Sequence, residues 1–432
     1  MKRTTPWKSW TCRGLALAAL TTPLPAADES GSLEAYLRRM RTARESEQTR
    51  LRPQVEELVK RLGQTRTANE LKKTHADLEA LGSEAVVLLV PYLDPGNTPT
   101  PEQEKQAQEV AMLLSRAKNP ALLGDLVRRA NLASPRGRVL AVRVLGESPE
   151  VARALEALHA LHPNVNGSLR AECVRALARL APADPLIVAA LSDPHPEVIA
   201  AGLRALAGEP RKKPRAEAVA LLGDESRGAD VLAELVDYFA VPGQEIDDDV
   251  VSGLVHFALR EDLPVQTRLK VLDGLPRLGI KLSSRLSREL EPLLDTSDSA
   301  LKDGALVALT LLKDGRARRE LMRHYDEQVK ENETWPNAYK LRGDIELRIG
   351  DYKEAARDYE DALRLHGESA RLPGNRDLWV NLARAQVKDN KLKAAAETLE
   401  RFGLASDLKR ALRADPDFLP LLEHPKYKSL FE

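Results

Sequence analysis

The sequence predicts an all-α fold, an alpha-alpha superhelix built from stacked helical hairpins. Two observations lead to this prediction. Aromatic residues make up only 4% of the 432 residues, so the core must consist mainly of Leu, Ala and Val, which suits closely packed helices better than sheets. A short apolar pair ending in Leu also recurs at a nearly constant interval, which is typical of a repeat protein.

The recurring pair lies inside Ala-rich segments with helical spacing of apolar residues. Its copies are Ala80-Leu81, Met112-Leu113, Val144-Leu145, Ala176-Leu177, Ala205-Leu206, Gly274-Leu275 and Ala308-Leu309. Successive intervals are 32, 32, 32, 29, 69 and 34 residues, and the interval of 69 covers two repeats with the missing copy near Tyr238-Phe239. A period of this length indicates helical hairpins that bury their apolar faces against one another.

Each repeat contains a break, as at residues 192–196, where two prolines end one helix and Asp193 is expected to cap the next. The stretch DPHPEVIAAGLRALAG (193–208) and the preceding residues 168–194 resemble the HEAT-like repeat of the phycobilisome-lyase type. The resemblance implies a HEAT-like solenoid over residues 53–330. It says nothing about the partner.

A different repeat begins after residue 330. The stretch PNAYKLRGDIELRIGDYKEAARDYEDALRLHG (336–367) resembles the tetratricopeptide repeat. In that family Gly343 and Ala355 would let two helices touch, Gly350 would form the turn, and Tyr359 and Leu363 would fill the seam. The resemblance implies tetratricopeptide hairpins over residues 331–432, although His366-Gly367 gives the first hairpin an atypical ending.

Residues 377–402 resemble a second copy, with Asn390 at the position of the turn glycine, and residues 406–432 resemble a terminal cap. At the other end, residues 28–52 form a charged helical segment with Leu33, Tyr36, Leu37 and Met40 on one face. We interpret this segment as an N-terminal capping helix, because the end repeats of a solenoid must cover their own apolar surface.

Residues 1–27 predict a signal peptide. Basic residues precede the apolar run 15–20, and Pro25-Ala26-Ala27 comes before the polar segment that starts at Asp28. The protein is therefore expected to be periplasmic or secreted. The alternative is a cytoplasmic protein with a disordered leader, because the apolar run is short.

Composition and motifs exclude several classes of function. The chain has 65 basic and 65 acidic residues, so no global basic excess points to nucleic acid. No later segment is apolar enough to span a membrane, and no nucleotide-binding or hydrolase motif is present. We expect no catalytic residue, cofactor or metal.

Four features could be taken for sites, but their residues favour structural interpretations. His159 and His162 lack further ligands at metal-binding spacing. The acidic loop 242–249 lacks the alternating pattern of a calcium loop. Cys173 lies at a core position, and the basic loop 209–215 has no aromatic neighbour.

The favoured function is a non-catalytic protein–protein interaction scaffold of the cell envelope that binds partner segments on its concave face. The alternatives are a cytosolic assembly adaptor and, from the lyase-type resemblance, a bilin-lyase-like enzyme. An export signal and an appended tetratricopeptide array both argue against such an enzyme.

The tetratricopeptide resemblance also implies a peptide-binding groove lined by the first helix of each hairpin. The residues projected onto that face are Lys340, Asp344, Leu347, Arg348, Val380, Asn381, Arg384, Val387 and Lys388. Lys340 and Asn381 match the positions with which some relatives hold a peptide carboxylate, whereas Asp344 departs from the pattern. The cations predict an acidic peptide partner; an ordinary solvated face is the alternative.

If residues 1–27 are a signal peptide, the protein isolated from its native source should begin near Asp28. Mass spectrometry of the intact protein measures this directly. A native chain that keeps Met1 would contradict export by this signal.

Overall fold

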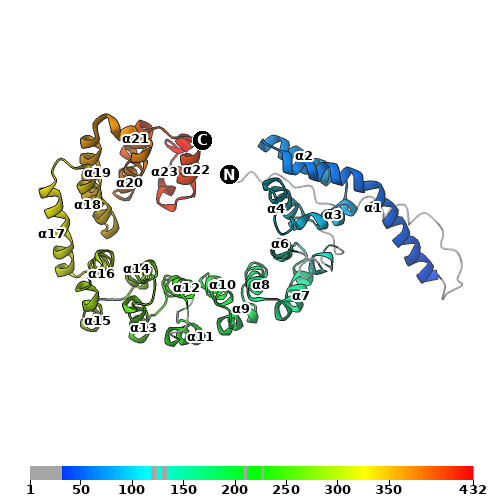
Figure 1. Ribbon diagram of the computed structural model, residues 1–432, viewed down its shortest axis with the longest axis horizontal. Coiled ribbons are helices and arrows are strands. Elements are labelled where there is room, and N and C mark those ends of the chain that lie inside the picture. Colours follow the sequence, from blue (N-terminus) through cyan, green and yellow to red (C-terminus); the bar gives the residue numbers. More distant parts are fainter. Residues whose placement is uncertain are drawn as a thin grey trace. The chain divides into compact units, whose positions relative to one another are not determined.

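The computed structural model describes residues 32–117, 122, 124–128, 134–208, 212–224 and 228–431. The predicted signal peptide lies outside these residues, as do the side chain of Leu33 and residues 209–211 of the basic loop. Every regular element in the described part of the chain is helical (Figure 1). The chain divides into two compact units, one formed by residues 1–209 and 215–238 and the other by residues 210–214 and 239–432.

The first unit consists of helical hairpins whose short second helices often end in a 3-10 turn. Its helices are α1 (Ser32–Gln64), α2 (Ala68–Ala80), α3 (Ser83–Leu89), η1 (Val90–Leu93), α4 (Pro101–Ser115), α6 (Pro135–Leu145), α7 (Val151–Leu161), η2 (His162–Asn164), α8 (Gly167–Leu180), α9 (Pro185–Ala189), η3 (Ala190–Ser192), α10 (Pro196–Ala207), α11 (Ala216–Ala220), η4 (Leu221–Gly223) and α12 (Ala229–Phe239).

The second unit continues with longer helices and ends in a group of short ones. Its helices are α13 (Asp248–Leu259), α14 (Val265–Gly274), η5 (Leu275–Leu278), α15 (Ser284–Leu294), α16 (Ser299–Leu311), α17 (Gly315–Glu331), α18 (Pro336–Ile349), α19 (Tyr352–His366), η6 (Gly367–Arg371), η7 (Pro373–Asn375), α20 (Arg376–Lys388), α21 (Leu392–Phe402), α22 (Ser406–Ala414), η8 (Pro416–Phe418), α23 (Leu419–Glu423) and η9 (Lys428–Phe431).

The periodic pairs of the sequence mark equivalent helices of successive hairpins. Leu145, Leu177 and Leu206 are buried on α6, α8 and α10, which pack against one another in that order. The copy expected near residue 238 is supplied by α12, where Tyr238 and Phe239 are fully buried. The period in the sequence therefore corresponds to the stacking interval of the hairpins.

Equivalent helices approach closely where a small residue meets another small residue. A Cβ atom on Gly146, at the end of α6, would lie 2.6 Å from the Cβ of Ala176 on α8. Real Cβ atoms do not approach so closely, so any larger residue at position 146 would push the two helices apart. The small residues thus set the packing distance of the stack.

The N-terminal helix differs from the predicted cap. The structure has one helix, α1, running through Pro53, where the sequence suggested a boundary between a cap and the first repeat. Core packing begins at Leu51, whereas Tyr36, Leu37 and Met40 are 45–55% exposed. The second half of α1 therefore packs onto the first unit, and the apolar face predicted to cover the end of the stack is open.

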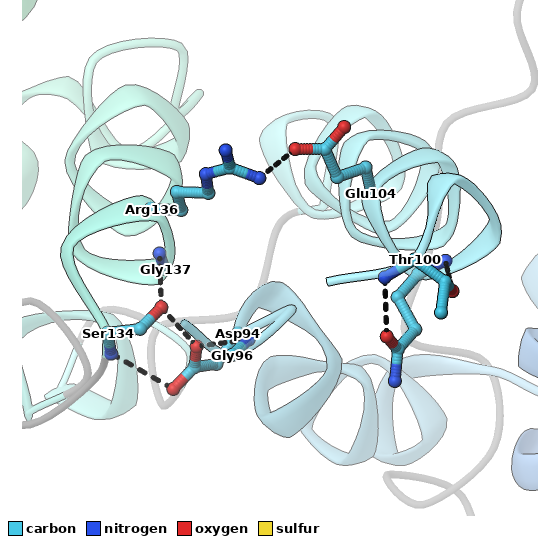
Figure 2. A network of polar contacts seen from close by, with 8 residues as sticks. Asp94, Gly96, Thr100, Glu104, Ser134, Arg136 and Gly137 are labelled. Carbon is cyan, nitrogen blue, oxygen red and sulfur yellow. Dashed lines mark hydrogen bonds and ion pairs between the residues drawn. The ribbon is translucent and has the colours of Figure 1, made fainter. Parts of the chain in front are cut away.

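Polar contacts hold the connections between hairpins in place. Figure 2 shows Asp94, just after η1, accepting hydrogen bonds from the backbone N–H of Gly96 at 3.0 Å and of Ser134 at 3.1 Å. Ser134 is the N-cap of α6, and its hydroxyl accepts from the N–H of Gly137. One carboxylate thus orders a turn and the start of the next helix.

The expectation that Asp193 caps a helix is wrong. The N-cap of α10 is His195, which makes no side-chain capping bond, and Pro196 takes the first helical position. Asp193 lies two residues earlier, accepts a hydrogen bond from the N–H of His195, and forms an ion pair with Arg170 at 2.7 Å. It stabilises the turn and joins that turn to α8.

The hairpin of α18 and α19 packs as its sequence suggested. A Cβ atom on Gly343 would lie 3.1 Å from the ring of Tyr359, and both Tyr359 and Ala355 are fully buried. The turns after α18 and α20 contain Gly350 and Asn390 with φ of 88° and 60°, a left-handed conformation that Gly and Asn tolerate best.

The C-terminal residues pack over the end of the last hairpin. Phe418 and Leu421 are fully buried and Phe431 is nearly so, and all three belong to one cluster with Ala383 and Leu399 of the last hairpin. The short helices from α22 onward thereby cover the apolar surface that α20 and α21 would otherwise expose.

Replacing Tyr359 by Ala should reduce the free energy of unfolding by about 3–5 kcal/mol, because the ring fills the seam between α18 and α19. Tyr359→Phe keeps the ring and loses only the hydroxyl, so it should cost about 1 kcal/mol. Chemical denaturation of the parent and both variants measures the difference. A loss below about 1 kcal/mol for Tyr359→Ala would contradict the packing described here.

Candidate functional site

The residues predicted to bind a peptide come from α18 and α20, the first helices of two successive hairpins. We call the surface formed by Lys340, Asp344, Asn381, Arg384 and Lys388 the α18/α20 face. On each helix these residues recur at intervals of three or four, so they share one side. All five remain partly exposed.

Asp344 lies at the centre of this face and joins the two helices. Its carboxylate forms an ion pair with Lys340 at 2.7 Å and accepts hydrogen bonds from the hydroxyl of Tyr359 at 2.8 Å and the side-chain amide of Asn381 at 3.2 Å. Asp344, which departs from the residue pattern of the tetratricopeptide family, is therefore an acceptor for three neighbouring donors. Burial and the adjacent carboxylate both raise the pKa of Tyr359, which keeps its hydroxyl protonated as a donor.

Arg384 extends the network from α20 into the cap. It donates to the side-chain oxygen of Asn381 and pairs with Asp415 at 2.8 Å and with Asp417 at 3.2 Å. Lys388, one turn further along α20, pairs with Asp417 at 2.5 Å. The cations expected to attract an acidic ligand are thus already paired within the chain.

The other predicted residues occupy different environments. Arg348 is exposed and forms an ion pair with Asp273 of α14 at 2.9 Å. Leu347 and Val380 are half-buried against the two hydrophobic clusters of the last hairpins. Val387 is 6% exposed and packs in the core under the cap, so it offers little surface to a ligand.

The α18/α20 face is consequently a fixed and electrically balanced surface. Its three cations are matched by the carboxylates of Asp344, Asp415 and Asp417. Sequence reasoning missed the two acids of the cap. Asp415 follows Arg384 by 31 residues, which is close to the repeat period, and this separation was the signal that could have identified Asp415 as its partner.

A second group of charges centres on Arg342 of α18 and links α18 to α17 and α19. Arg342 holds Asp358 through two hydrogen bonds of 2.7 Å and reaches Asp326 of α17 at 2.9 Å. Glu346, one turn further along α18, is 7% exposed, and one of its carboxyl oxygens has no hydrogen-bond partner. Burial, followed by the nearby charge of Asp358, raises the pKa of Glu346 to about 8.

His159, the acidic loop and Cys173 have structural roles. His159 lies 2.7 Å from Asp184, which also caps α9, and Asp247 of the acidic loop caps α13. Cys173 is fully buried, and burial raises the pKa of its thiol to about 12, so it is a poor nucleophile. Within the described ranges, no cluster of three or more His, Cys, Asp or Glu side chains could hold a metal.

Because the pKa of Glu346 is raised in the folded chain, we expect the free energy of unfolding to fall as pH rises. In the unfolded chain a glutamate titrates near 4.5, whereas in the folded chain Glu346 keeps its proton up to about pH 8. Below pH 4.5 the carboxyl group is protonated in both the folded and the unfolded chain, and the folded chain has its full stability. Between pH 4.5 and pH 8 the group ionises in the unfolded chain but not in the folded chain, so the free energy of unfolding decreases. Because one pKa unit corresponds to about 1.4 kcal/mol, the loss should be on the order of 5 kcal/mol.

Denaturation of the parent chain and of Glu346→Gln at several pH values measures this effect. The difference in stability between variant and parent should grow in favour of the variant as pH rises. Glu333→Gln, at an exposed position before α18, is the matched control and should follow the parent. Parallel pH profiles for the parent and Glu346→Gln would contradict a buried neutral carboxyl group.

No protein-family model and no curated protein matches the chain. Among solved structures it is similar to one described as "Crystal structure of Kap121p", with 11% identity, a TM-score of 0.37 and 87% of this chain covered. The chain spans 44% of that protein. No helix in the described part of the chain is long and apolar enough to cross a membrane.

Proposed function

We propose that the chain is a non-catalytic scaffold that binds segments of partner proteins, and that the α18/α20 face is one of its binding surfaces. Support comes from the fixed network on this face, in which Asp344 and Arg384 join two hairpins and the cap. Donors and acceptors held in one geometry lose little conformational entropy on binding, which favours recognition of a defined segment.

The ion pairs of the α18/α20 face determine which charges a partner segment must carry to bind there. An acidic residue of the partner would have to compete with Asp344 for Lys340, or with Asp417 for Lys388. These pairs are partly exposed, so exchange of one carboxylate for another is inexpensive. The proposal therefore keeps an acidic segment as the partner, with orientation set by the order of charges along the face.

The proposed location is the cell envelope, and it rests on the signal peptide predicted from residues 1–27. A scaffold exported in this way would meet its partners outside the cytoplasm. Cys173 is the one cysteine that would remain after cleavage, and it is buried, so such a protein would fold without disulfide bonds.

Replacing Lys340 and Arg384 together by Ala should weaken partner binding roughly tenfold or more at low salt, because both cations of the central network are lost. The full chain, this variant and a control with Lys212→Ala and Lys213→Ala serve as baits for an envelope fraction. Quantitative mass spectrometry then compares the retained proteins.

Proteins retained by the parent and by the control, but depleted on the double variant, would support the proposal. The control removes the same number of positive charges from an exposed loop, so it corrects for nonspecific electrostatic capture. Equal retention of the same proteins on all three baits would contradict a binding role for this face.

A further inference from the structure

The start of α1 carries an exposed apolar stripe. Tyr36, Leu37 and Met40 are 53%, 55% and 45% exposed. Side chains three or four positions apart lie on the same side of an α-helix, so Tyr36 and Leu37 both lie beside Met40. Figure 1 shows the dark blue start of α1 extending beyond α3, and core packing along this helix begins only at Leu51.

Exposed apolar side chains are concentrated at this stripe. Eight large apolar side chains are exposed among the described residues, and three of them fall within positions 36–40. No other two of the eight lie within five positions of each other. Single exposed apolar residues are ordinary on a folded protein, whereas a group of them indicates an interaction surface.

Arginines border the stripe on both sides. Because successive residues of an α-helix are rotated by about 100°, Arg39 lies about 60° beyond Tyr36, and Arg41 lies about 40° beyond Leu37 at the other edge. Arg38, Arg39 and Arg41 are exposed, and no carboxylate of the described residues lies within ion-pair distance of them. They differ in this respect from the cations of the α18/α20 face, which are paired within the chain.

The positive charge of this segment exceeds its negative charge. Four arginines and no acid occur at positions 36–44. Only Arg44 has an acidic partner in the described chain, Glu84 of α3 at 2.7 Å. Of the next acids, Glu45 lies about 140° around the helix from the middle of the stripe, and Glu47 is paired with an arginine of the same helix. An occupant of the stripe would therefore meet three unpaired guanidinium groups.

A second copy of the chain fits this surface poorly. A symmetric dimer brings the same surface of both copies together, so Arg39 and Arg41 of one copy would face the same residues of the other. Like charges at such distances repel each other. The stripe is also short for such an interface, because stable interfaces commonly use roughly 20–30 residues from each partner.

An anionic lipid surface matches both the apolar stripe and its cationic borders. A helix that lies in the plane of a membrane places apolar side chains at the boundary of the acyl chains, and cations on its polar side pair with lipid phosphates. The long side chains of Arg39 and Arg41 can reach the headgroups from the edges of the stripe. Tyr36 combines an apolar ring with a polar tip, a combination that is enriched at membrane interfaces.

We propose that the exposed start of α1 attaches the protein to the surface of an anionic membrane. Tyr36, Leu37 and Met40 enter the interface, and Arg38, Arg39 and Arg41 pair with lipid phosphate groups. The helix lies along the membrane surface and does not cross it. The proposal is independent of the proposed binding function, because α1 and the α18/α20 face belong to different compact units.

Sedimentation of the full chain with lipid vesicles tests this inference. Vesicles of phosphatidylcholine and phosphatidylglycerol in equal amounts should bind the parent at least about tenfold better than vesicles of phosphatidylcholine alone. Leu37→Gln with Met40→Gln removes the stripe without changing the charge and should weaken this binding at least about tenfold. Thr42→Gln with Ser46→Gln is the matched control, because both exposed residues lie on the opposite side of α1.

A second pair of variants tests the cations. Arg39→Gln with Arg41→Gln should weaken binding to the anionic vesicles at least about tenfold and reduce its dependence on salt. Lys212→Gln with Lys213→Gln removes the same charge from an exposed loop and should bind like the parent. All four variants should melt at the temperature of the parent, because none of the changed residues belongs to the core.

Equal sedimentation of the parent and the variant with Leu37→Gln and Met40→Gln would overturn the inference, because residues elsewhere in the chain would then bind the lipid. A parent that binds neither kind of vesicle would also overturn it. Gel filtration would then assign the stripe to a second copy if the parent is a dimer that this variant dissociates, and to a partner protein if the parent is a monomer.

Discussion

The fold depends on the close contact between successive hairpins at small residues. One hairpin cannot bury its own apolar face, so each packs against the next, and the distance between two successive hairpins is set where Gly146 on α6 meets Ala176 on α8. Within the hairpin of α18 and α19, Gly343 allows a similarly close approach to Tyr359. Contacts such as that of Gly146 with Ala176 join hairpins that are neighbours along the chain. The first and last hairpins lack a neighbour on one side, so other residues must cover their apolar surface. At the C-terminal end, Phe418 and Phe431 cover the last hairpin.

The same stacking determines the electrostatics of the surface. Ion pairs join equivalent helices at separations close to the repeat period: Glu104 with Arg136, Arg143 with Glu172, and Arg204 with Glu234. Arg384 pairs at a similar separation with Asp415, which lies between α22 and η8 of the cap. A cation that looks unpaired along one helix is therefore neutralised by the next repeat. Each such exposed pair contributes little to stability. Together, however, the carboxylates of the cap neutralise the positive charge that the sequence of α20 alone would predict for this surface.

Local features of the chain could be predicted because they depend on neighbours in the sequence. The repeat period located the stacked helices, and the left-handed turn at Asn390 followed from its position in the repeat. Features that depend on contacts between repeats could not be predicted. The burial of Val387 under the cap and the pairing of Arg384 with Asp417 both require knowledge of how the tail folds back. Burial alone would also not reveal Glu346, whose missing hydrogen bond depends on the orientation of its side chain.

The two sides of α20 are held by different polar contacts. On one side, Asn381 and Arg384 join α20 to α18 and to the cap. On the other side, Gln386 accepts a hydrogen bond from the hydroxyl of Thr398 on α21, and the indole N–H of Trp379 donates to the carbonyl oxygen of Ala370 in the connection after α19. Because α20 is fixed from both sides, the side chains of the α18/α20 face are presented in one defined geometry, which lowers the entropy lost on binding.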